Sequence, residues 1–138
     1  MSRKRALVLS LALAAPAAAL AMGLGGDTPT RIPVPSAEFS ATVEDVSGTV
    51  MDVTHVTFDG DVYLAGMIGE AQVAVPFEKI ATVRVEPTND ETRRVALATL
   101  KDGTTVRVIV ERDVPCYGAA VFGNYKIEVE KIRKITFH

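Results

Sequence analysis

The residues of this chain that could carry out chemistry are few. The sequence contains one cysteine, Cys116, and two histidines, His55 and His138. A metal site would need several ligands at fitting spacing, and the sequence has no cluster of histidines and cysteines. His55 lies among valines and threonines, which favours an exposed strand residue, and any catalytic triad would have to use it. We therefore expect no catalytic residue, no metal ligand and no cofactor.

Cys116 lies in the segment 114–123 and cannot form a disulfide within the chain, because it is the only cysteine. One interpretation is a reactive thiol or a disulfide to another chain. The other is a small apolar side chain buried in a packed segment. We prefer the second, since no histidine lies nearby in the sequence to activate the thiol.

The apolar residues after Phe39 follow the period-two alternation of β-strands, and no stretch there has a sustained helical period. The expected strands are 42–46, 50–58, 62–65, 71–77, 81–86, 94–100, 104–111 and the two alternating runs between residues 125 and 137. Short strands separated by regular turns predict an all-β fold. We expect a small β-sandwich or a partly open barrel of about 9–10 short antiparallel strands.

An internal repeat is centred on the sequence Glu-Lys-Ile, which occurs at residues 78–80 and again at 130–132. Each copy joins two alternating runs. The apolar spacing of three from Ile132 to Ile135 does not fit a flat strand, so a corner, a bulge or one helical turn is expected there. Ile80 and Ile132 are then predicted core residues. Two copies in one domain predict two related halves, and a chance match is the alternative.

Asp-Gly pairs at residues 59–60 and 102–103 predict hairpin turns. One pair precedes each Glu-Lys-Ile sequence, which extends the similarity between the two copies of the repeat toward the N-terminus. The first pair begins 19 positions before Glu78, whereas the second begins 28 positions before Glu130. The second copy would therefore carry about nine extra residues, within 111–120.

Segments added to a scaffold often carry binding residues, and aromatic side chains are common anchors of interfaces. The extra segment is therefore our candidate partner-contact loop, with Val114, Cys116, Tyr117 and Phe122 as its candidate residues. It would either cap one end of the core or contact a partner.

The N-terminal part of the chain has the features of an export signal. Residues 3–5 are basic, an apolar run of 15 residues follows, and Ala19 and Ala21 are small residues at a cleavage site. Residues 1–21 are predicted to be a signal peptide, cleaved between Ala21 and Met22, and an uncleaved anchor is the alternative. The run is shorter than the roughly 20 residues of a spanning helix, so we expect no integral membrane span in the mature chain.

The mature chain is expected to comprise two parts. Residues 22–38 are rich in glycine and proline and predict a flexible leader, with an extended arm along the domain as the alternative. Residues 39–138 form a single all-β domain.

Without residues 1–21 the chain keeps 12 basic and 17 acidic residues, a net charge of −5, so nucleic acid is not an expected partner. We expect an exported, periplasmic or secreted, non-catalytic β domain that acts in binding or assembly in the cell envelope. Its partner would be an envelope protein or a second copy of the chain. The alternatives are a small-ligand carrier with an internal apolar cavity and an enzyme without a recognisable motif.

Overall fold

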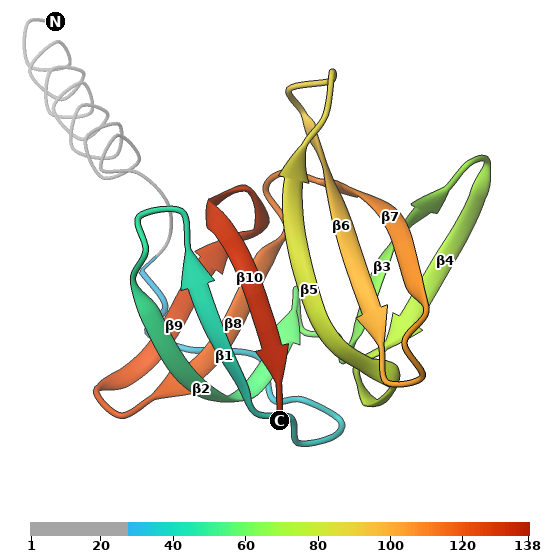
Figure 1. Cartoon of the computed structure of the whole chain (residues 1–138). Coiled ribbons are helices and arrows are strands. Elements are labelled where there is room, and N and C mark those ends of the chain that lie inside the picture. The colour runs from blue at the N-terminus through green and yellow to red at the C-terminus, as the bar shows by residue number, and fades with distance from the viewer. Residues whose placement is uncertain (1–27) are drawn as a thin grey trace, which may run out of the picture.

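The computed structural model describes residues 28–138, which form one antiparallel sheet of ten strands (Figure 1). The strands are β1 (Ala41–Asp45), β2 (Val50–Phe58), β3 (Tyr63–Ile68), β4 (Ala71–Pro76), β5 (Ile80–Pro87), β6 (Arg93–Leu100), β7 (Thr105–Glu111), β8 (Pro115–Ala120), β9 (Gly123–Glu128) and β10 (Ile132–Phe137). Two 3₁₀ turns, η1 (Phe77–Lys79) and η2 (Val129–Lys131), precede β5 and β10. The all-β prediction is confirmed, and the curled sheet forms a half-barrel.

The strands lie in the order β4-β3-β7-β6-β5-β10-β1-β2-β8-β9. This order divides into two halves of five strands that meet at the β5–β10 pair. The middle of the sheet consists of the strands β7, β6, β5, β10, β1 and β2, side by side in this order. The β3–β4 hairpin continues the sheet beyond β7 and the β8–β9 hairpin continues it beyond β2, and both curl away from the central strands (Figure 1). One face of the central strands therefore encloses the core and the other faces solvent.

The two halves have the same architecture and come from a repeat along the chain. Strands β1–β5 and β6–β10 each comprise a hairpin, a second hairpin, a 3₁₀ turn and a final strand. In the sheet, the β3–β4 hairpin of the first repeat lies beside β7 of the second, and the β8–β9 hairpin lies beside β2. Each half of the sheet therefore contains strands from both repeats, because the two repeats exchange their second hairpins. The two related halves that the sequence predicted are present in this exchanged arrangement.

The upstream part of the predicted match is wrong. β3 begins at residue 63 and β8 at residue 115, so equivalent residues lie 52 positions apart from there to Ile80 and Ile132. Gly103 (φ 92°) corresponds to Gly48 (φ 90°) in the first turn of the other repeat, not to Gly60. The predicted insertion does not exist, because Pro115–Ala120 is β8, the counterpart of β3. An Asp-Gly pair marks a hairpin turn without telling which hairpin it belongs to.

The core lies inside the curl and is filled by side chains. Ile80 and Ile132 follow the two 3₁₀ turns and are 0% and 1% exposed, as the repeat predicted. The Phe77 ring packs against Phe39, Phe58 and Phe137, with centroid distances of 5.6, 5.5 and 4.8 Å. Such aromatic pairs add stability beyond the area that they bury.

Residues 28–40, which include the described part of the predicted leader, contact the sheet. The backbone N–H of His55 donates to Glu38 Oε1 at 2.7 Å, and the His55 imidazole also pairs with this carboxylate. His55 has a φ of 54° at an irregularity in the β2–β8 pairing, and its side chain is exposed as predicted. The signal peptide and its cleavage site lie outside the described residues.

Candidate functional site

The four residues of the predicted contact loop lie in and beside the β8–β9 hairpin. Cys116 is fully buried in the core, whereas Tyr117, its neighbour in β8, faces the other way and is half-buried. Val114 is half-buried in the turn before β8, and Phe122 is exposed at the turn between β8 and β9. Phe122 is therefore the most exposed of the four predicted residues. The four residues do not form one continuous surface, since Cys116 is buried.

The turn that contains Phe122 is the most exposed apolar feature among residues 28–138. Ala120 pairs with Gly123, so Val121 and Phe122 form the two-residue tip of the hairpin. Val121 is 103% exposed and Phe122 is 65% exposed. We call these two residues the apolar tip. Exposed apolar side chains at a loop end lose the free energy of burial unless another molecule covers them.

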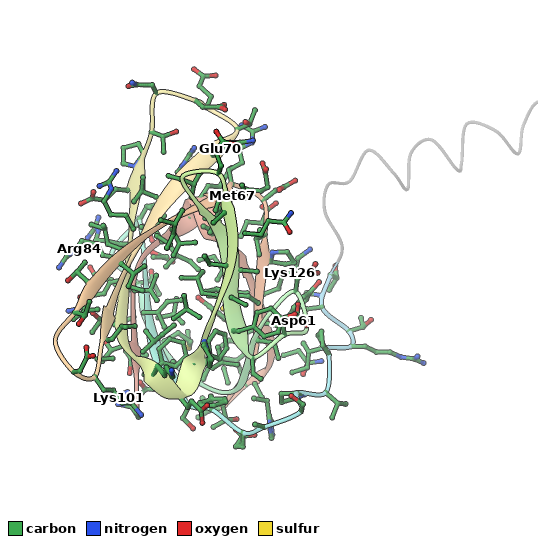
Figure 2. All side chains as sticks on the ribbon, turned by 90° about the vertical axis from the view of Figure 1, so that its right-hand side faces the viewer. Asp61, Met67, Glu70, Arg84, Lys101 and Lys126 are labelled. Atoms are coloured by element: carbon green, nitrogen blue, oxygen red, sulfur yellow. The ribbon has the colours of Figure 1, made fainter. Side chains whose placement is uncertain are left out.

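The other half of the molecule provides an internal control for the apolar tip. The equivalent β3–β4 turn carries Gly69 and Glu70, between the paired residues Ile68 and Ala71. Figure 2 shows Glu70 at the free end of this hairpin. Because the same hairpin forms with a glycine and a glutamate at its tip, the fold does not require Val121 and Phe122 to be apolar.

An open cleft of about 460 Å³ lies beside the apolar tip. Its polar lining comes from Asp52, Thr54, Ser40 and His138, and its apolar lining includes Val121. These residues belong to segments that are distant in the sequence, and the β1–β2, β1–β10 and β2–β8 pairings bring them together.

Two side chains that line this cleft, Asp52 and His138, form with Thr42 a hydrogen-bonded cluster that the sequence analysis missed. Thr42 Oγ1 donates to Asp52 Oδ1 at 2.6 Å and lies 2.7 Å from His138 Nε2. His138, which the sequence analysis did not consider for a triad, is the histidine that contacts this hydroxyl. In a serine-protease triad, however, the histidine lies between the other two groups. Here the hydroxyl lies in the middle, so Asp52 does not orient the imidazole.

Burial controls the ionisation of two groups in the same half. It raises the pKa of the Cys116 thiol to about 12. Burial, with smaller effects of Cys116 and Asp45, also raises the pKa of Tyr125 to about 12. A thiol that is protonated and inaccessible at neutral pH is a poor nucleophile, which fits the preferred interpretation of Cys116 as a core residue.

Within residues 28–138, no group of three or more histidine, cysteine, aspartate or glutamate side chains is placed to hold a metal ion. The same part of the chain contains no helix long and apolar enough to cross a membrane.

Residues 35–138 match a family model described as "Uncharacterised protein". No curated protein and no solved structure matches the chain.

Proposed function

We propose that this chain, which belongs to the family whose model it matches over residues 35–138, is an exported, non-catalytic binding or assembly module of the cell envelope. The observation that carries the proposal is the apolar tip, Val121 and Phe122, at a hairpin whose counterpart ends in Gly69 and Glu70. Export follows from the leader predicted in residues 1–21. The apolar tip is the anchor that inserts into a pocket of a partner protein.

Two alternatives have less support. A ligand carrier needs an enclosed apolar space, whereas the interior here is packed around Phe77, Ile80 and Ile132. Two hollows of the described chain, of about 480 and 460 Å³, are clefts open to solvent. An enzyme would need a nucleophile or an acid–base pair with suitable partners, and the order of groups in the Thr42 cluster does not provide a triad.

The test is capture of a partner from the native envelope fraction by the mature protein, followed by reconstitution with the purified partner. The variant Val121→Ser/Phe122→Ser should melt like the wild type and lose the partner. Ile68→Ser is the matched control, because Ile68 is an exposed apolar residue at the other hairpin and is 40% exposed. This control should retain the partner.

Tyr117→Ala separates contact from capping. If Tyr117 contacts the partner, the variant melts normally and its affinity falls, whereas a capping role lowers the melting temperature. Sedimentation of the wild type and of the tip variant detects self-association by the same residues. If the tip variant keeps every partner and the same mass in solution, the proposal for the apolar tip fails.

A further inference from the structure

The solvent-facing side of the central strands carries side chains in regular rows. Strands β2, β1, β10, β5, β6 and β7 lie side by side in this order. Residues that are directly opposite in antiparallel strands share one face of the sheet, so the registers define rows that run across the strands. Neighbouring positions in a row are about 4.8 Å apart, the distance between strands.

One row consists of five threonines. Thr42 lies opposite Thr136, Thr136 opposite Thr82, Thr82 opposite Thr99, and Thr99 opposite Thr105. We call these five residues the threonine row. Asp52 of β2 lies opposite Thr42 and ends the row at the cleft beside the apolar tip.

Most hydroxyls of the threonine row are available to a ligand. Thr42 is engaged with Asp52 and His138. Among residues 28–138, the hydroxyls of the other four threonines have no protein hydrogen-bond partner. Thr105 is exposed and the other three are half-exposed, so water or a ligand can reach them.

A cationic row runs parallel to the threonine row, two residues further along the strands. Lys134 lies opposite Arg84, and Arg107 lies two strands beyond Arg84, with Leu97 between them. We call these three basic residues the cationic row. Like charges directly opposite each other destabilise a sheet, and among the described residues none of the three forms a salt bridge. A stability requirement alone does not explain the pair of Lys134 and Arg84.

The carboxylates on this face leave the cationic row mostly uncompensated. Glu44 lies opposite Lys134, but its carboxylate accepts a hydrogen bond from Arg133 Nη1 at 2.9 Å. Asp52 lies at the far end of the threonine row and is bonded to Thr42. Glu86 is the third, two positions beyond Arg84 on the side away from the threonines. Glu111 is the fourth, four positions beyond Arg107 on β7, and its carboxylate lies 3.8 Å from Arg93 Nε. Figure 2 shows Arg84 on the opposite side of the molecule from Lys126, pointing away from the body.

We propose that this face binds an acidic glycan chain that runs across the strands. The threonine row supplies hydroxyls at a regular spacing for the sugar hydroxyls, and the cationic row beside it pairs with the carboxylates of the sugars. The cluster of Asp52, Thr42 and His138 adds polar groups where the row enters the cleft. The residues of the two rows include no aromatic side chain on which a nucleobase could stack, which favours a glycan over a single-stranded nucleic acid.

Titration of the mature protein with polygalacturonate tests the proposal, with neutral dextran, polyphosphate and a single-stranded oligonucleotide as comparison ligands. Polygalacturonate should bind, and the three comparison ligands should bind at least tenfold more weakly. Arg84→Glu/Lys134→Glu should weaken polygalacturonate binding at least tenfold. Lys126→Glu, a charge reversal on the opposite side, should leave it unchanged.

Thr82→Val/Thr99→Val removes two hydroxyls while it keeps the β-branched shape, and it should weaken binding several-fold without changing the melting temperature. This variant keeps the proposal testable if the charge reversal does not fold. The proposal is overturned if polygalacturonate does not bind or if the threonine variant binds as the wild type does. Equal binding of polyphosphate or the oligonucleotide would also overturn it, because charge alone would then suffice. These outcomes are independent of the apolar tip.

Discussion

Gly66 of β3 and Gly118 of β8 occupy equivalent positions, and each lies against a strand of the other repeat. A Cβ atom on Gly66 would lie 2.3 Å from the carbonyl oxygen of Ile109 in β7. A Cβ atom on Gly118 would lie 2.9 Å from Val53 Cβ in β2. Each of the two hairpins, β3–β4 and β8–β9, therefore packs against a strand of the other repeat at a glycine. Any larger residue at these two positions would displace atoms of the neighbouring strand.

We predict that Gly66→Ala and Gly118→Ala both destabilise the protein, because each added methyl group overlaps backbone or β-branched atoms. The loss should be about 1–3 kcal/mol for Gly118→Ala and at least as large for Gly66→Ala, whose contacts are closer. Denaturant unfolding measures both. Gly69→Asn is the control: nothing lies within 4 Å of its Cβ position, and asparagine tolerates its φ of 60°. Equal stability of all three variants would contradict the close docking.

Ile80→Ala and Ile132→Ala should each lower the free energy of unfolding by about 2–5 kcal/mol, since both side chains are buried at equivalent corners. This is a large part of the roughly 5–15 kcal/mol typical of a domain. Val121→Ala is the matched exposed control and should change stability by less than about 0.5 kcal/mol. A shift below about 1 kcal/mol in either isoleucine variant would refute the equivalence of the two corners.

The protein should lose stability in alkaline solution. Cys116 and Tyr125 have ordinary pKa values of 9.0 and 10.0, and both are raised to about 12 in the folded chain, mainly by burial. Below pH 9 both groups are protonated in the folded and in the unfolded chain, so their contribution to the free energy of unfolding is fully present. As the pH rises from 9 to 12, the unfolded chain loses these protons first and is stabilised. The free energy of unfolding should then fall by up to about 1.4 kcal/mol per pH unit for the buried Cys116. The fall should be smaller for Tyr125, because its ring is partly exposed and solvent screens its charge.

Unfolding measured from pH 7 to pH 11 tests this pH dependence. Cys116→Ala removes one of the two groups and should reduce the slope above pH 9, whatever its effect on stability at pH 7. An identical slope in the variant would show that Cys116 is not responsible.

Export should release a chain that begins at Met22. The reason is the combination of a basic start, an apolar run of 15 residues and small residues at 19 and 21. Intact-mass analysis of the exported protein measures the cleavage point. Ala19→Arg/Ala21→Arg should block cleavage, because the cleavage site needs small residues. Retention of residues 1–21 in the wild type would support an uncleaved anchor.

The sequence determines the local structure of this protein. Alternation of apolar and polar residues predicts strands, because the side chains of a strand point to opposite faces at each step. Nine of the ten strands, the corners at Ile80 and Ile132 and most of the hairpin turns follow from such short-range patterns, whereas β8 was wrongly predicted to be an added loop. The repeat was visible through Glu-Lys-Ile, and the pair Gly66 and Gly118, 52 residues apart, could have set its register correctly.

The tertiary structure alone decided which strands pair. A β3–β4 hairpin has the same local pattern whether it pairs with β2 or with β7, so no local rule reveals the exchange. Strand pairing depends instead on long-range packing: the strands adopt the order and register that bury the apolar face of every strand in the same core. The cluster of Thr42, Asp52 and His138 depends on these registers, as does the threonine row. Such rows join residues from opposite ends of the chain, because antiparallel ladders align positions by distance across the sheet and not by distance along the sequence.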